Sequence, residues 1–81
     1  MRDWCVYLLR CADDTLYCGI TNDLTKRVAD HNAGRGAKYT RGRLPVAAVA
    51  TRCDLTECEA RSLEYHVKRL PRSRKIQFLQ G

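Results

Sequence analysis

The segments WCVYLL at residues 4–9 and LYCGI at residues 16–20 predict a β-hairpin. The first segment is apolar at both odd and even positions, which is typical of a strand covered on both faces. The tract ADDT at residues 12–15 is a turn signal, so the second segment is expected to be the returning strand.

The length of the hairpin loop determines which side chains share a face of the sheet. A loop with an even number of residues would place Tyr7 and Tyr17 on opposite faces, whereas an odd loop places Tyr7, Tyr17 and Gly19 on one face. Asp tolerates the left-handed backbone region better than most residues, so a three-residue loop with Asp14 in that region is compatible with the sequence.

A first helix is expected after this hairpin. The tract TND at residues 21–23 supplies N-cap candidates, and Gly34 should end the helix. Arg27 and His31 lie one turn apart and border its apolar stripe. From residue 32 to residue 45 we expect a Gly-rich basic loop.

The remaining elements are a third strand over Val46–Arg52, a second helix and a short last helix. Thr56 and Glu59 form a capping box that should begin the second helix. Pro71 should end that helix, and Ser73 is the expected cap of the last one. The expected buried stripe of the second helix consists of Ala60, Leu63, Val67 and Leu70. The prediction is a single α+β domain over residues 1–81, in the order β-β-α-β-α with a short C-terminal helix.

The charge of the chain is concentrated in its second half. The protein has 81 residues and a formal net charge of +6. Residues 1–33 hold four basic and five acidic residues, whereas residues 34–81 hold eleven basic and four acidic ones. Eleven of the fifteen basic residues are Arg, whose planar guanidinium suits phosphate. This distribution favours a polyanionic partner, most simply nucleic acid, although charge alone leaves a purely solubilising role equally open.

The five cysteines favour neither a disulfide framework nor a metal site. Their number is odd, no two of them form a C-x-x-C pair, and the chain carries no signal-peptide hydrophobic region. No apolar run is long enough to cross a membrane, so the expected location is the cytoplasm, where thiols stay reduced. All five cysteines are therefore expected to be structural side chains, and a redox role is the remote alternative.

Several of these residues, taken together, resemble a known family. CVY at residues 5–7 and YCG at residues 17–19 look like the paired strand motifs of the GIY-YIG nucleases. The similarity continues in order through Thr21, Arg27, His31 and Glu64. It covers about residues 4–70, and the tract GAKYTRG at residues 36–42 is similar to the small stand-alone bacterial members.

The resemblance implies a three-stranded antiparallel sheet with flanking helices and one divalent-metal phosphodiesterase site. Mg²⁺ or Mn²⁺ is the implied cofactor, and Glu64 is the implied metal ligand. A single carboxylate suits Mg²⁺, which keeps several waters and takes other ligands from substrate phosphate. The implied catalytic residues are Tyr7, Tyr17, Arg27, His31 and Glu64.

The residue types fit hydrolysis of a phosphodiester. Arg27 would stabilise charge that develops on the phosphate. One tyrosine would deprotonate or position the attacking water, while the other tyrosine and His31 hold it in a hydrogen-bonded network. Since a free Tyr has a pKa of ~10, a tyrosine base would need activation by metal or Arg. Gly19 leaves room for the phosphate to approach.

The sequence departs from the family pattern at auxiliary positions. Cys5 stands where the glycine of the first motif would be, and Ile20 stands where many members carry Lys. The tract RKIQ at residues 74–77 offers no Asn to match the one that several members use near the site. None of these departures touches the implied metal carboxylate.

Basic residues outside the site are expected to hold the phosphate backbone. The predicted nucleic-acid contacts are Gly19, Arg35, Lys38, Tyr39, Arg41, Arg43, Lys68 and Arg72. No recognition helix or zinc finger is evident, so contact with backbone shape is favoured over base reading. The predicted function is a metal-dependent, structure-selective endonuclease, with DNA favoured over RNA as the substrate.

Two other functions remain open from the sequence. The alternative to the nuclease is a nucleic-acid-binding module on the same fold that does not cut. A third reading is a basic surface that docks an acidic partner protein. The small footprint also leaves room for a homodimer or a protein partner.

Overall fold

The structure, a computed structural model, describes residues 2–80. The hairpin consists of β1 (Trp4–Arg10) and β2 (Leu16–Thr21), and it is followed by the helices α1 (Leu24–Asn32) and α2 (Lys38–Arg41). The chain continues through the strand β3 (Ala47–Leu55) into the helices α3 (Glu57–Lys68) and α4 (Arg72–Gln80). The expected α+β class and element order are confirmed, with α2 as an addition.

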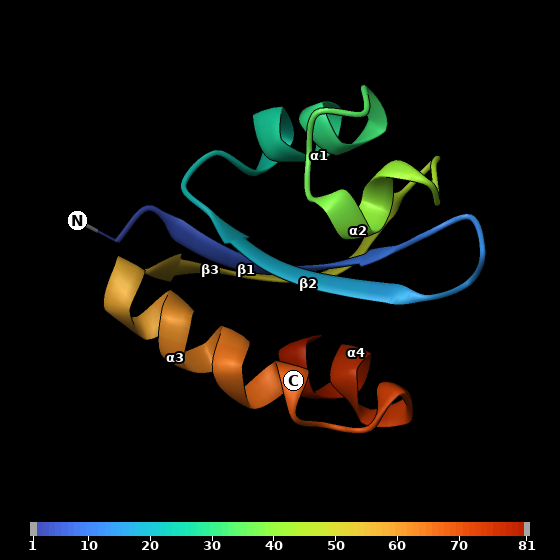
Figure 1. Cartoon of the computed structure of the whole chain (residues 1–81). Coiled ribbons are helices and arrows are strands. Elements are labelled where there is room, and N and C mark those ends of the chain that lie inside the picture. Colours follow the sequence, from blue (N-terminus) through green and yellow to red (C-terminus); the bar gives the residue numbers. More distant parts are fainter. Residues whose placement is uncertain (1, 81) are drawn as a thin grey trace.

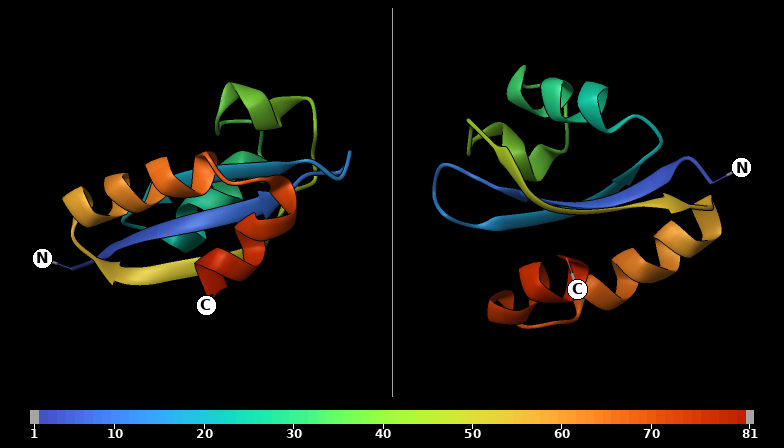
Figure 2. Two further views of the ribbon diagram at one scale, coloured as in Figure 1. Left: turned by 90° about the horizontal axis from the view of Figure 1, so that it is seen from below. Right: turned by 180° about the vertical axis from the view of Figure 1, so that it is seen from behind.

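The sheet has three antiparallel strands in the order β2-β1-β3. Helices cover both of its faces: α1 and α2 lie on one side, and α3 and α4 lie on the other (Figures 1 and 2). The central strand β1 is buried at five consecutive positions, as its apolar sequence predicts. Among residues 2–80, no helix combines the length and the apolar character that a membrane span requires.

Alternate residues of β1 belong to two separate clusters of the core. Val6 and Leu8 pack with α3 and α4 through Ala60, Val67 and Leu79. On the opposite face lies a second cluster of Tyr7, Leu9, Cys11 and Val46, with Tyr17, Leu24, Val28 and Leu44 against it. The period of two along a strand therefore separates an aliphatic layer from a layer that contains two tyrosines.

The hairpin has the odd loop. Asp14 has a φ of 67°, and the N–H of Cys11 donates to the carbonyl of Thr15, which leaves three residues between them. The register then pairs Tyr7 with Gly19 and Leu9 with Tyr17. Tyr7, Tyr17 and Gly19 consequently share one face, the one that α1 and α2 cover.

The helix caps follow the sequence signals closely. The side chain of Asp23 accepts a hydrogen bond from the backbone N–H of Lys26 at the start of α1, which ends two residues before Gly34. The capping box of Thr56 and Glu59 begins α3, with both reciprocal hydrogen bonds formed.

Several expected boundaries are wrong. The basic stretch at residues 32–45 is not entirely loop, because residues 38–41 form the single turn of α2. Leu70 lies beyond the end of α3, since a proline at position 71 disfavours helical geometry at the residue before it. Ser73 is not a cap, because α4 already begins at Arg72. The third strand runs three residues past the expected Arg52, and its last residue pairs with Trp4.

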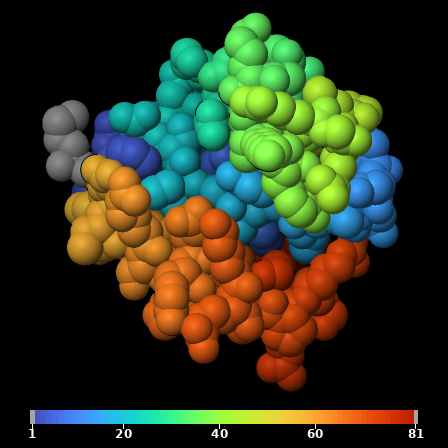
Figure 3. Space-filling view, in the orientation of Figure 1, coloured from blue at the N-terminus to red at the C-terminus, as the bar shows by residue number. Residues whose placement is uncertain are grey.

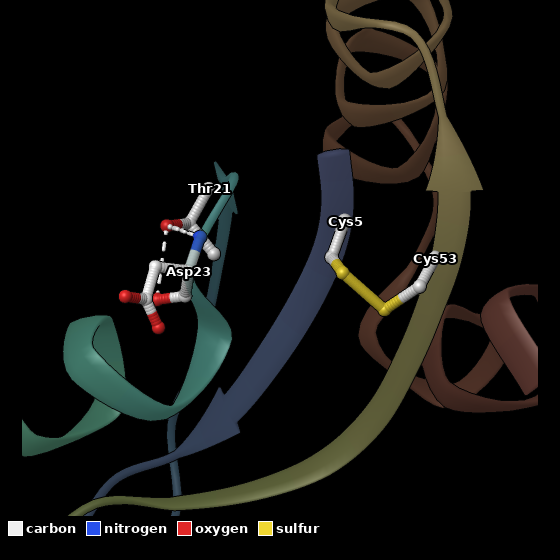
Figure 4. The surroundings of a disulfide bond; sticks show 4 residues. All are labelled: Cys5, Thr21, Asp23 and Cys53. Atoms are coloured by element: carbon white, nitrogen blue, oxygen red, sulfur yellow. Dashed lines mark hydrogen bonds between the residues drawn. A yellow bond between two sulfur atoms is a disulfide. The ribbon is translucent and has the colours of Figure 1, made fainter. Parts of the chain in front are cut away.

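The expectation that all five cysteines are unpaired is also wrong. Cys5 and Cys53 form a disulfide between β1 and β3 (Figure 4). The register of these strands shifts between Trp4 and Val6, and this irregularity brings the two cysteines opposite each other. The free cysteines are Cys11, Cys18 and Cys58. Because the paired cysteines are 48 residues apart, only the pairing of the strands reveals the bond.

Candidate active site

Two tyrosines and a glycine form the floor of the candidate site. The ring centroids of Tyr7 and Tyr17 are 6.3 Å apart. A Cβ atom at residue 19 would lie only 2.5 Å from the hydroxyl of Tyr7 and 3.1 Å from the ring of Tyr17. Gly19 is therefore the residue type that lets the two phenols lie against this strand.

His31 reaches the same floor from the last turn of α1. Its Nε2 atom lies 3.0 Å from the hydroxyl of Tyr7, and both side chains are buried. The imidazole also lies against Tyr17, with ring centroids 5.4 Å apart. Since α1 begins directly after β2, His31 lies over the strand that carries Tyr17.

The other nitrogen of His31 faces residues of the α2 segment. Its Nδ1 atom lies 2.8 Å from Oγ1 of Thr40, a fully buried residue on α2. Gly36 lies so close to the imidazole that any side chain there would collide with it. Neither Thr40 nor Gly36 was expected in the site from the sequence. The only signal was their position in the tract at residues 36–42, where the chain resembles its relatives.

Arg27 lies one turn before His31 and is half-buried. Burial raises the pKa of Tyr7, and the nearby Arg27 guanidinium opposes that shift. Burial lowers the pKa of His31, and the positive charge of Arg27 lowers it further. The hydrogen-bonded pair of Tyr7 and His31 is consequently neutral near pH 7, with a cation beside it.

Glu64 lies on the other side of the sheet from this cluster. It is part of α3, and its carboxylate forms an ion pair with Lys68 at 3.3 Å. Burial raises the pKa of Cys18 to about 11, and the negative charge of Glu64 adds to this shift. Glu64 is therefore near the face of β2 that packs against α3 and α4. Within residues 2–80, no hydrogen bond or ion pair joins Glu64 to Tyr7, Arg27 or His31. The structure thus brings together four of the five expected catalytic residues and places the carboxylate apart from them.

A groove of about 260 Å³ crosses the edge of β2 between these two groups. It is lined by Leu16, Tyr17, Cys18, Tyr39, Lys68 and Lys75. Because β2 is an edge strand, its atoms are visible between the helical layers in Figure 3. The groove therefore connects the tyrosine side of the sheet with the helix that carries Glu64. Lys75 was not expected there.

The predicted nucleic-acid contacts fall into two groups. Lys38 and Arg41 are exposed on α2, and neither forms an ion pair with another described residue. Arg35 is exposed and lies 3.6 Å from the carboxylate of Asp30. These three cations and Gly19 face solvent or the site floor.

The second group is already engaged within the fold. Arg43 donates to Asp13 at 2.9 Å and lies over the ring of Tyr39. Arg72 donates to the backbone carbonyl of Asp14 and so holds the same hairpin tip from α4. Lys68 pairs with Glu64. Tyr39 stacks on Tyr17, with ring centroids 5.9 Å apart, and forms a wall of the groove.

Comparison with known proteins agrees with this architecture. Residues 3–77 match the model of the GIY-YIG catalytic domain. The chain is 49% identical over 76 residues to a UPF0213 protein of Nitratidesulfovibrio vulgaris, covering 94% of this chain and 69% of the relative. It is 50% identical over 76 residues to a UPF0213 protein of Clostridium perfringens, covering 94% and 82%.

Two solved structures are similar as well. A UPF0213 protein from Bacillus halodurans, studied by NMR in solution, has a TM-score of 0.57 and 45% identity, covering 93% of this chain and 80% of that one. An E. faecalis protein, also an NMR structure, has a TM-score of 0.64 and 37% identity, covering 98% and 88%. The chain therefore belongs to the GIY-YIG catalytic domain family.

Proposed function

We propose that this domain is a metal-dependent endonuclease that hydrolyses phosphodiester bonds in DNA with selectivity for structure rather than base sequence. The observation that carries this proposal is the buried pair of Tyr7 and His31 beside Arg27. This pair packs near Tyr17, which lines a groove together with Tyr39 and two lysines. The nuclease character of the family supports it.

The chain's own residues suit the chemistry of the phosphate. Arg27 would stabilise negative charge on the non-bridging oxygens, because its guanidinium stays charged and can donate two hydrogen bonds. Tyr17, which is only half-buried, would position the attacking water, and the buried Tyr7 would pass a proton to Nε2 of His31 at 3.0 Å as this network takes up the proton of the water. A free phenol is a weak acid with a pKa of ~10, so direct contact with an acceptor matters.

Glu64 is the residue that we assign to the metal. Residues 2–80 contain no cluster of three or more His, Cys, Asp or Glu side chains that could enclose an ion. A single carboxylate on the helix that borders the groove fits Mg²⁺ or Mn²⁺, which keep water ligands and share substrate oxygens. When bound, such an ion would neutralise charge on the phosphate and lower the pKa of water.

The carboxylate test uses Glu64→Gln with Glu57→Gln as its control. Both residues lie on α3, and each pairs with a basic residue four positions later, so both substitutions cost only about 0.3–0.5 kcal/mol of stability. We expect Glu64→Gln to lose cleavage of branched, nicked or single-stranded DNA in Mg²⁺ or Mn²⁺, and Glu57→Gln to keep it. Wild-type protein that cuts none of these substrates would refute the proposal.

One observation favours a second candidate, a binding module that does not cut. Glu64 pairs with Lys68, and no hydrogen bond or ion pair among the described residues joins it to Tyr7, Tyr17 or His31. In that case Glu64→Gln should strengthen DNA binding by removing the negative charge that is paired with Lys68, and the affinity of the wild type should fall steeply with salt. Fluorescence anisotropy at two salt concentrations, combined with the cleavage assay, separates the candidates.

A further inference from the structure

The hydrogen bonds around His31 allow two placements of its ring proton. In the first, Nδ1 carries the proton and donates to Oγ1 of Thr40 at 2.8 Å, while Nε2 accepts from the hydroxyl of Tyr7 at 3.0 Å. In the second, Nε2 carries the proton and donates to the oxygen of Tyr7, and Nδ1 becomes an acceptor.

The surroundings favour the first placement. The hydroxyl of Thr40 already has an acceptor for its single proton in the carbonyl of Ala37, at 2.9 Å. Its oxygen is then free to accept from Nδ1, and every hydroxyl in the chain of contacts is satisfied. In the second placement the hydroxyl of Tyr7, which is 1% exposed, would have no acceptor among the described residues. Leaving a buried donor unpaired costs about 1–3 kcal/mol.

One contact opposes this placement. The backbone N–H of Ala37 points toward Nδ1 at 3.4 Å, which would require an acceptor there. That distance lies outside the usual range of about 2.7–3.2 Å for such a bond, and Ala37 is only half-buried. Water can therefore satisfy this N–H, whereas the buried phenol has no such substitute.

We propose that Thr40 is a positioning residue that fixes the tautomer of His31, so that a bare Nε2 faces the hydroxyl of Tyr7. Nε2 can then take up the proton that Tyr7 gives up when the tyrosine network receives one from the water, while Nδ1 keeps its own proton in the hydrogen bond to Oγ1 of Thr40. The tautomer follows from the contacts alone. Its catalytic use rests on the proposed function.

The fold explains why this residue is on α2. The short helix places Thr40 above the imidazole, and Gly36 lets the preceding loop pass directly against the ring. Both His31 and Thr40 are fully buried, so neither nitrogen of the ring can exchange its partner for bulk water. Residues that hydrogen-bond and orient metal-bound histidines typically change activity about 10- to 100-fold when they are removed, and we expect an effect of this size for Thr40.

The test compares Thr40→Val, which has the same shape but no hydroxyl, with Thr40→Ser, which keeps the hydroxyl. Long-range ¹H–¹⁵N correlation spectra report which ring nitrogen carries the proton, and the exposed His66 provides an internal reference. We expect wild type and Thr40→Ser to show a protonated Nδ1. Thr40→Val should show a mixed or reversed tautomer and about 10- to 100-fold slower cleavage. Thr25→Val, at an exposed position on α1, should change neither.

The outcomes separate this inference from the proposed function. A wild-type ring protonated at Nε2, or an unchanged tautomer in a folded Thr40→Val, would overturn the role of Thr40 even if the protein cuts DNA. If the tautomer responds as expected and no substrate is cut, the positioning role stands and the nuclease proposal fails. Should Thr40→Val not fold, the wild-type and Thr40→Ser spectra still decide the assignment.

Discussion

Replacing Gly19 with Ala should displace Tyr7 from His31. The new Cβ atom would lie 2.5 Å from the hydroxyl oxygen of Tyr7 and 2.7 Å from its Cζ atom, whereas ordinary contacts of a Cβ begin at 3.4 Å. The phenol must therefore retreat by about 0.9 Å, the difference between 3.4 and 2.5 Å. Tyr7 has little space for this movement, since it is buried in the core beside Leu9 and Val46.

Two magnitudes follow from that displacement. Overpacking of a core typically costs about 1–3 kcal/mol of the free energy of unfolding. A shift of about 1 Å in a catalytic group can slow a reaction about 100-fold, so the loss of activity should exceed what the stability change explains. The hydrogen bond between Tyr7 and His31, 3.0 Å long in the native structure, should be broken or strained.

The matched control is Gly42→Ala. A Cβ atom at residue 42 would meet nothing within 4 Å, and the backbone φ of −93° is one that Ala adopts without strain. We expect its stability to be unchanged or slightly higher. Urea unfolding, NMR of the ring signals and the cleavage assay should be run on both variants.

Two results would refute this reasoning about Gly19. One is a Gly19→Ala protein with wild-type stability and wild-type cleavage. The other is a loss of DNA affinity while the signals of Tyr7 and His31 stay in place, which would assign Gly19 to the approach of the phosphate instead.

Two further predictions concern stability. The loop closed by Cys5 and Cys53 spans 48 residues, so reduction should cost roughly 4 kcal/mol in the chain-entropy model and lower Tm by roughly 15–30 °C. Thermal unfolding with and without a thiol reductant checks this. A Cys5→Ser/Cys53→Ser variant should have the same Tm in both conditions. An unchanged Tm of the wild-type protein after reduction would contradict a stabilising role of the disulfide. The pKa of His31 lies below its ordinary 6.5, so the unfolded chain takes up the proton first. Stability from the neutral ring is present above pH 6.5 and is lost as the pH falls toward the folded pKa. Urea unfolding at pH 7.5 and 5.5 should show a larger acid loss for wild type than for His31→Gln, and equal losses would count against it.

Local rules in the sequence determined much of the fold and of the site floor. An apolar run at residues 4–9 predicts a central strand, and its pairing with residues 16–20 depends only on the period of two and on a loop that Asp14 permits. The same period places Tyr7, Tyr17 and Gly19 on one face. Arg27 and His31 lie one turn apart in any helix that starts after β2, so their joint arrival over that face is also a local consequence.

Contacts between distant segments were decided only by the tertiary structure. The bond from Cys5 to Cys53 depends on an irregular register between β1 and β3 that no spacing of cysteines encodes. From the sequence, Arg43 and Arg72 were expected to contact phosphate. In the folded chain they instead bind the hairpin tip at residues 13 and 14.

Thr40 and Glu64 show the same division within the candidate site. Thr40 meets His31 because the α2 turn folds over the ring, and Glu64 lies across the sheet edge from the tyrosines because α3 packs on the opposite face. Periodicity fixes where a side chain points within its own element. It carries no information on which elements the hydrophobic layers bring together, and this packing places the proposed metal ligand and the partner of the histidine.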